Sequence, residues 1–469
     1  PLATCQQRRR FVELDPVFLS RAQFAFTISF HILFPTLTIG LGSYIAFLEA
    51  RWLMTKNPFL LQHAKFWSKI FALTFGMGVV TGIVLSYEIG TNFAPFATAT
   101  GNVLGPLLSY EVLTAFFLEA GFLGVMLFGW NRVGPKLHFA ATIAVALGTL
   151  ISSFWILSAN SWMQTPAGAE LRDGVFYPVD WWAIVFNPSF PYRLTHMVLA
   201  AFLTTAVFVA GVSAIRILQG KSREFFSYSL KYGVFTAALL APLQIAVGDL
   251  HGLNTFEHQP LKVAAMEGNW ERRANAPLLI FAIPDQEAAE NHFEIGIPNG
   301  ASWILTHTAD GAIPGLKEVP PEDRPYVPTV FFAFRIMVGI GLLFLFASWT
   351  GAIQAWRGRL LDSPKLLKLF ALMTPLGFIA VVSGWWVTEV GRQPYTVYGL
   401  MRTEDSVSAI TGGEVGMSLG VFLLLYSLLF GAYLYYLTKV IRSPEKDRIR
   451  EGAPDAPARP AFVAPGEEQ

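Results

Sequence analysis

Apolar stretches long enough to cross a lipid bilayer recur along the whole of this chain. Of its 469 residues, 53% are hydrophobic and only 14% are charged, whereas a soluble protein carries about 25% charged residues. A helix needs about 20 mainly apolar residues to span the hydrocarbon core of a bilayer. Window hydropathy predicts nine such spans, at residues 22–50, 67–90, 105–130, 138–158, 192–217, 229–249, 329–353, 369–390 and 414–438. We therefore predict an all-α polytopic membrane protein.

One connection between the predicted spans is much longer than the others. Residues 250–328 are polar and rich in proline, and loops of this length are often functional. They separate spans 1–6 with the N-terminal segment (1–249) from spans 7–9 (329–440). The last residues, 441–469, are charged and then rich in proline and alanine, which predicts a disordered tail.

Lysine and arginine are concentrated in the connections that follow spans 1, 3, 5 and 7 and in the C-terminal tail. The connections after spans 2 and 4 are nearly free of them. The positive-inside rule therefore places the first set, with the C-terminus, in the cytoplasm. The N-terminus and residues 250–328 are then outside. Arg8–Arg10 and Arg21 favour the opposite orientation, but the four internal loops outweigh them.

Composition also excludes several kinds of site. The single cysteine, Cys5, allows neither an internal disulfide nor a cysteine-based metal or iron–sulfur centre. No basic stripe stands apart from the loops, so nucleic acid is not an expected partner. The apolar run after Arg8–Arg10 lacks the short apolar core and cleavage site of a signal peptide, and we interpret it as a retained first span.

Four residues in the predicted spans can act as ligands of haem iron: His31, His196, Met337 and Glu389. Polar groups at membrane depth are costly, so each is a functional candidate. A lone membrane histidine can equally serve an interhelical hydrogen bond, and a buried methionine usually packs in the core. At about 1.5 Å per residue, the first three lie roughly 13, 6 and 12 Å from the outer ends of their spans. Glu389 lies at an outer end, so all four share the outer half of the bilayer.

The number of membrane histidines limits the kind of haem protein. Two bis-histidine haems need four membrane histidines, and a haem–copper site needs still more, whereas only two lie inside spans here. A haem protein built on this chain must therefore also use methionine or glutamate. A histidine opposite a methionine forms a normal low-spin pair, and a carboxylate suits a high-spin site with an open face for a gas.

Two carboxyl groups share the third span. Glu111 and Glu119 are eight residues apart, on nearly one face of a helix, with Glu119 about 12 Å nearer the cytoplasm. Carboxyls at stepped depth suit a proton relay, and the alternative is a pair of salt bridges to neighbouring helices. Arg335, two residues before Met337, needs an anion, which a haem propionate would supply; Arg392 could serve in the same way.

Six phrases in this sequence resemble those of a known family. They are SRAQFAFTISFHILF (Ser20–Phe34), KFWSKIFALTFGMGVVTGI (Lys65–Ile83), EVLTAFFLEAGFLGVMLFGW (Glu111–Trp130), WILSANSWMQTP (Trp155–Pro166), AFRIMV (Ala333–Val338) and GWWVTEVGRQP (Gly384–Pro394). Together they are similar to subunit I of the cytochrome bd-type quinol oxidases, over roughly residues 15–440. The GRQP phrase with its preceding glutamate is highly specific.

The resemblance implies an enzyme that oxidises quinol and reduces O2 to water, with three haems in one subunit. It implies His196 and Met337 as the ligands of a low-spin haem b near the quinol site. It implies His31 and Glu389 as ligands in a high-spin pair, made of a second haem b and either a haem d or a further haem b. Which of the two residues holds which haem stays open.

The resemblance also implies roles for other residues. It assigns Glu111 and Glu119 to proton delivery, and it assigns Lys262 and Glu267 of the long loop to quinol binding and oxidation. A lone lysine and glutamate in a loop are usually solvated, so the role of this pair rests on the resemblance alone. Trp385, on the face of the glutamate ligand, can pack on a porphyrin, although a tryptophan near the outer surface is about as often an interfacial anchor.

The long loop lacks the insertion that some family members carry, so the chain resembles the short-loop subgroup, of which the cyanide-insensitive oxidases are one type. The family implies a second membrane subunit, subunit II, leaves room for a small single-span subunit, and places the protein in a bacterial cytoplasmic membrane. Quinol, O2 and the lipid bilayer are the other expected partners. The rival interpretation is a secondary transporter with Glu111, Glu119 and Arg335 as its coupling residues.

Overall fold

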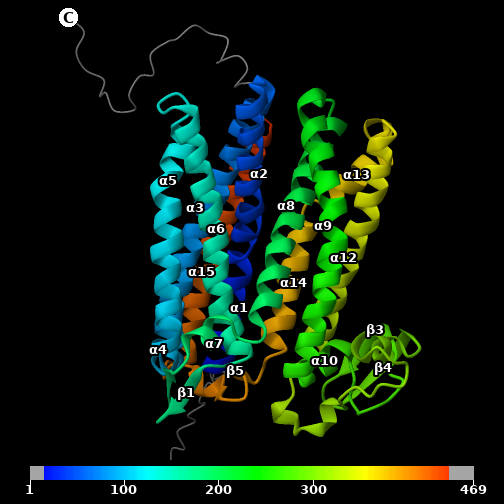
Figure 1. The fold of residues 1–469 in the computed structure, drawn as a ribbon. Coiled ribbons are helices and arrows are strands. Elements are labelled where there is room, and N and C mark those ends of the chain that lie inside the picture. The colour runs from blue at the N-terminus through cyan, green and yellow to red at the C-terminus, as the bar shows by residue number, and fades with distance from the viewer. Residues whose placement is uncertain (1–14, 443–469) are drawn as a thin grey trace, which may run out of the picture.

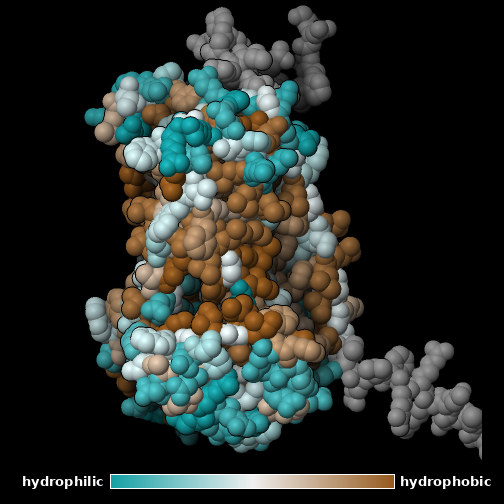
Figure 2. All heavy atoms as spheres, turned by 90° about the vertical axis from the view of Figure 1, so that its right-hand side faces the viewer, coloured by the Kyte–Doolittle hydropathy of each residue, from teal (hydrophilic) through white to brown (hydrophobic). Residues whose placement is uncertain are grey.

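Nine long helical stretches stand side by side in the computed structural model, which describes residues 15–442 (Figure 1). Each is long and apolar enough to cross a membrane, and a broad apolar band separates two polar ends of the molecule (Figure 2). The described part of the chain thus confirms the all-α polytopic fold with nine spans. The predicted tail from residue 443 onward, Cys5 and Arg8–Arg10 lie outside the described residues.

Some spans are single helices and others contain a break. The single helices are α3 (Pro58–Asn92), α6 (Pro135–Gln164), α8 (Phe190–Leu218), α9 (Arg223–His258), α12 (Val327–Trp356) and α15 (Gly412–Ile441). The broken spans are α1 (Pro16–His31) with α2 (Leu33–Thr55), α4 (Ala94–Glu111) with α5 (Phe117–Phe128), and α13 (Pro364–Met373) with α14 (Leu376–Val390). A π-helical turn at Val112–Phe116 joins α4 to α5.

Proline explains one break and one contact between spans. The ring of Pro35 would clash with the carbonyl four residues earlier, which belongs to His31, and α1 ends at that residue. Pro242, inside α9, leaves the Ala238 carbonyl without its helical donor. Trp349 of α12 donates its indole N–H to that carbonyl at 2.9 Å, so the proline ties α9 to α12.

Helices α8, α9, α12 and α14 form a four-helix unit within the bundle. Helix α8 contacts α9, α9 contacts α12, α12 contacts α14, and α14 contacts α8 again. Helices α8 and α12 therefore lie diagonally opposite each other. Helix α8 also packs against α2, α6 and α13. In the most apolar 18-residue stretch of this span, 72% is buried inside the protein. Helix α8 is the central helix of the molecule.

The segment between α9 and α12 is folded and lies at one end of the bundle, which we call the loop end (Figure 1). It contains α10 (Pro260–Glu267), an antiparallel hairpin of β3 (Leu278–Asp285) and β4 (Glu290–Ile297), and α11 (Gly300–Thr306). The same end carries the hairpins β1 (Ala169–Arg172) with β2 (Val175–Pro178) and β5 (Tyr395–Val397) with β6 (Met401–Arg402), and the short α7 (Trp181–Val185).

Helix α9 runs past the domain boundary predicted at residues 249 and 250, because it continues to His258. Hydropathy falls near Asp249, but no proline lies between Asp249 and Pro260. The residue before a proline is driven away from helical conformation, and Gln259 is the residue at which α9 stops. The polar end of α9 therefore projects into the loop end and carries α10 directly after it.

Candidate haem and quinol sites

His196 and Met337 lie on diagonally opposite helices of the four-helix unit, α8 and α12. A glycine on the neighbouring helix makes room for each of them. A Cβ added at Gly248 of α9 would lie 3.2 Å from His196 Cε1, and one added at Gly384 of α14 would lie 2.9 Å from Met337 Sδ. A histidine and a methionine that approach from opposite helices would be suited to hold one haem iron.

The His31 ring is oriented by Thr81 of α3. The Thr81 hydroxyl donates to the Met77 carbonyl at 2.9 Å, so its oxygen accepts from His31 Nδ1 at 2.9 Å. This assigns the ring proton to Nδ1 and leaves the Nε2 lone pair free for a metal. A Cβ at Gly82 would lie 3.3 Å from the ring, so a glycine again makes room for the histidine. His31 fits the requirements of a haem ligand.

We expect Thr81→Val to loosen the His31 ring and to change the high-spin haem spectrum. Valine matches threonine in shape but cannot accept the Nδ1 proton, and loss of such an outer hydrogen bond typically costs about 10- to 100-fold in metal affinity. Reduced-minus-oxidised spectra and haem content of the purified protein test this, with Thr74→Val as control. An unchanged high-spin band and haem content would contradict the role of Thr81.

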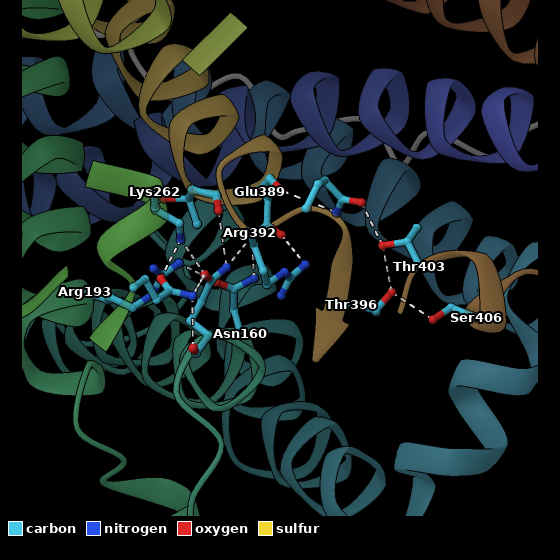
Figure 3. A network of polar contacts seen from close by, with 12 residues as sticks. Asn160, Arg193, Lys262, Glu389, Arg392, Thr396, Thr403 and Ser406 are labelled. Atoms are coloured by element: carbon cyan, nitrogen blue, oxygen red, sulfur yellow. Dashed lines mark hydrogen bonds and ion pairs between the residues drawn. The ribbon is translucent and has the colours of Figure 1, made fainter. Parts of the chain in front are cut away.

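Glu389 lies at the centre of a polar cluster at the loop end (Figure 3). Its Oε1 accepts from Asn160 of α6 at 2.9 Å, and its Oε2 pairs with Arg392. Asn160 in turn accepts from Arg193 of α8 at 2.6 Å. Lys262 of α10 approaches from another side (Figure 3). Residues from α6, α8, α10 and the end of α14 therefore meet at one carboxylate.

This cluster carries more positive than negative charge. Arg193, Lys262 and Arg392 are buried, and the charges of all three act on Glu389. Among the described residues, the buried atoms Arg193 Nε and Arg392 Nε and Nη1 have no hydrogen-bond partner. Buried positive charges need anions as partners, and guanidinium groups bind carboxylates well. The cluster therefore fits the propionates of a haem, and a contact of Arg392 with a propionate stays a prediction.

Lys262 is buried and not solvated, which overturns the usual expectation for a lysine in a loop. Its side chain is 3% exposed, and its ammonium donates to Gln164 Oε1 and Gln259 Oε1, both at 2.6 Å. Burial lowers the pKa of Lys262 well below its usual range; Arg193 and Arg392 lower it further, and Glu389 opposes them. An anion bound in this cluster would stabilise the charged lysine.

Glu267, at the other end of α10, is also buried, at 7% exposed. Its Oε2 lies 3.9 Å from Arg335 and has no hydrogen-bond partner among the described residues. Burial raises the pKa of Glu267 to about 6, and the Arg335 guanidinium opposes that shift. The carboxyl is thus poised near neutral pH with a free oxygen that can accept a proton. Lys262 and Glu267 point into different surroundings, as their spacing predicts.

Arg335 lies beside an anion that belongs to the chain itself, the Glu267 carboxylate. Its guanidinium donates to the carbonyls of Leu279, Met266 and Phe331 and lies beside Glu267. The segment between α9 and α12 folds back and supplies all of these partners except Phe331, and a contact of Arg335 with a haem propionate stays a prediction. Arg335 therefore belongs to the surroundings of Glu267.

Glu111 and Glu119 both face α6, as predicted from their spacing. The Glu111 carboxylate accepts from Ser152 at 2.7 Å, and the Glu119 side chain lies against Gly148, where a Cβ would come within 2.5 Å. Ser152 and Gly148 are one turn apart on α6, about 6 Å. The π-helical turn between the two glutamates is a feature common at functional sites. These contacts with a hydroxyl and a backbone fit a proton relay better than salt bridges.

The two tryptophans before Glu389 take different positions. Trp386 is 46% exposed and donates its indole N–H to Ser29 of α1 at 3.0 Å, so it links α14 to the helix of His31. Trp385 is half-buried, one turn before Glu389 on the same face of α14. Packing of Trp385 on a porphyrin stays a prediction.

Three residues of the polar cluster were missed from the sequence: Arg193, Asn160 and Gln164. Arg193 precedes His196 by three residues, which puts both on one face of α8. An arginine in a span one turn from a candidate ligand was an available signal. Asn160 and Gln164 gave no such signal, because their partners come from α8, α10 and α14.

A family model matches almost the whole chain. Residues 19–445 match the model described as cytochrome bd terminal oxidase subunit I. This chain belongs to that family. It is therefore a membrane-bound quinol oxidase subunit of aerobic electron transport, in a family that binds haem, and the secondary-transporter interpretation is wrong. The designation subunit I also implies a partner, subunit II.

Individual relatives agree over nearly their full lengths. The chain is 36% identical to cytochrome bd ubiquinol oxidase subunit 1 of Bacillus subtilis (strain 168), covering 95% of this chain and 97% of that one. It is 32% identical to cytochrome bd-II ubiquinol oxidase subunit 1 of Escherichia coli (strain K12), covering 91% and 96%. Its fold matches the solved bd oxidase from Geobacillus thermodenitrificans with a TM-score of 0.84 at 30% identity, covering 92% and 99%.

Proposed function

We propose that this bd oxidase subunit oxidises quinol at its loop end, outside the cell, and reduces O2 to water with protons drawn from the cytoplasm. The observation that carries the proposal is the placement of His196 and Met337 on opposite helices beside a buried cluster of excess positive charge. Oxidation of two quinols releases four protons outside and supplies four electrons. The four electrons, together with four protons from inside, convert one O2 to two waters. Charge therefore crosses the membrane without a pump.

His196 and Met337 would hold a low-spin haem b, and His31 and Glu389 would hold the high-spin pair, a second haem b with a haem d or a further haem b. Arg193 and Arg392, whose guanidinium atoms lack partners among the described residues, would bind propionates. The haems supply electron transfer and the O2-binding iron. Within the protein, Thr81 orients His31, and Trp385 is placed to pack on a porphyrin.

Glu267 is the proposed proton acceptor for quinol. Its buried oxygen without a partner can accept a quinol hydroxyl, and Arg335 stabilises the carboxylate that must be present before the reaction. Lys262, five residues earlier on α10, belongs to the Glu389 cluster and would position the quinol or a propionate through its ammonium. Glu119 and Glu111 would deliver protons from the opposite end of the bundle.

Glu267→Gln is expected to lower kcat/KM for quinol by about 100-fold, because the amide cannot take the proton. The wild-type rate should fall as pH drops below about 6, since the carboxyl is then protonated and cannot accept. This fall of the rate at acidic pH, the acidic limb of the pH profile, should be absent from Glu267→Gln. The matched control is Glu257→Gln, whose side chain is 76% exposed near the end of α9. A variant that keeps the acidic limb would exclude Glu267 as the acceptor.

The whole function can be tested on the complex with subunit II in sealed vesicles of known orientation. Quinol should drive O2 consumption with two quinols used per O2, acidify the loop-end side and consume protons on the other. Quinol oxidation without O2 consumption, or acidification of the opposite side, would contradict the proposed reaction or its direction. A bacterial cytoplasmic membrane, with the loop end outside, is the proposed location.

A further inference from the structure

The hairpin of β3 and β4 exposes an apolar face although it lies outside the spans. Large apolar side chains on it are strongly exposed, including Ile280 at 58%, Ile295 at 62% and Ile297 at 51%. Register shifts on either side of Phe281 place consecutive apolar residues of β3 outward. Trp303 and Ile304 of the adjoining α11 extend this surface. A contiguous apolar face of this kind marks an interaction site.

The hairpin stands beside the first turns of a membrane span and not beyond it. Leu279 and Ala282 pack on Phe331, and the Phe281 ring lies 6.3 Å from that of Phe332. Phe331 and Phe332 lie about 6 to 8 Å along α12 from its first residue. Figure 1 shows the hairpin at the lower end of α12, at the edge of the bundle. Its apolar face is therefore continuous with the lipid-facing surface of α12.

The polarity of the hairpin changes along its length. The turn carries Asp285, Glu287 and Glu290, and Gln286 beside them accepts from the Val327 amide at 2.9 Å, at the very start of α12. The exposed apolar residues lie on the strands, further along the span, where β4 also exposes His292 and Glu294. The acidic turn thus faces the water and the apolar face reaches toward the membrane interior, as the polarity gradient of a bilayer surface requires.

We infer that the outward face of this hairpin, formed by Ile280, Phe281, Ile295 and Ile297, is embedded in the lipid of the leaflet at the loop end. Almost every residue of β4 is exposed, and a two-stranded hairpin with an uncovered strand is marginal in water. Lipid on this face removes the apolar area from water. It also places a hydrophobic surface next to Glu267 and Arg335, where a membrane-dissolved quinol would enter if the proposed function holds.

A nitroxide at Ile295→Cys tests this placement in the complex with subunit II, reconstituted in lipid nanodiscs. Every labelled variant also carries Cys5→Ser, which removes the one cysteine of this chain. The complex with Cys5→Ser alone, treated with the same label, gives the signal from cysteines of subunit II, which is then subtracted. Ile336→Cys on the exposed face of α12 is the lipid reference, and Glu287→Cys in the acidic turn is the water reference. Haem spectra verify that each variant is folded.

Collision of the nitroxide with O2, which concentrates in lipid, is compared with collision with nickel ethylenediaminediacetate, which stays in water. The ratio of O2 to nickel accessibility at residue 295 should resemble that at residue 336 and exceed that at residue 287 several-fold. A ratio like that at residue 287 would overturn the lipid contact. Protection from both reagents would also overturn it, because protein would then cover the face. Neither result depends on quinol oxidation.

Discussion

Replacement of Met337 by leucine is expected to remove the low-spin haem spectrum and leave the other two haems in place. Leucine keeps the volume and apolarity of methionine, so the helix packing of α12 against α14 should survive. It has no lone pair for iron, so the ligand that would hold the low-spin haem together with His196 would be lost. Reduced-minus-oxidised absorption and haem content of the purified complex measure the effect, with haem falling from three to two per chain.

Met373→Leu is the matched control for that experiment. Met373 is fully buried at the end of α13 and is not among the proposed ligands. It should keep all three haems and the full low-spin band. A normal low-spin band in Met337→Leu would exclude this residue as a ligand. Loss of every haem in both variants would indicate a packing defect.

Glu119→Gln is expected to lower turnover by about 100-fold or more, the usual effect of removing a proton-transfer group. Glutamine has almost the same shape as glutamate, so it fits the tight space against Gly148 but carries no exchangeable carboxyl proton. Because Glu119 is remote from α10, kcat should fall while KM for quinol stays near the wild-type value. Steady-state O2 consumption at varied quinol concentration separates the two constants.

Glu119→Asp gives that experiment a rescue. Aspartate keeps the carboxyl on a shorter side chain, so part of the turnover should return. Haem spectra of both variants should match the wild type, since Glu119 is not a proposed ligand. Wild-type turnover in Glu119→Gln would mean that protons reach the site by another route, and loss of haem would indicate a structural role.

Local patterns in the sequence predicted the spans and the facing of Glu111 and Glu119. Apolar length and helical periodicity are properties of residues close together in the sequence. On α6, Ser152 donates to Glu111, and Gly148 leaves room for the Glu119 side chain. The extent of α9 was missed because hydropathy falls before the helix ends. The strands β3 and β4 were missed because the whole segment was treated as one polar loop, although β3 is almost entirely apolar and apolar residues alternate along β4.

Contacts between distant segments could not be predicted in the same way. The requirement of Arg335 for an anion followed from its depth, but its partner Glu267 depends on how α10 folds back against α12. The cluster around Glu389 draws on four segments, and only Lys262 and Arg392 had been singled out. Burial of Lys262 was likewise invisible in the sequence, because the glutamines that hold it come from α6 and the end of α9.

The central claim is that this one chain binds three haems through His31, His196, Met337 and Glu389. Pyridine haemochrome analysis of the purified two-subunit complex, with haem counted against protein, tests it most directly. Three haems per copy of this chain are expected, with two or three of type b and the remainder type d. One haem or none per chain, or a complex without a Soret band that changes on reduction with dithionite, would contradict the claim.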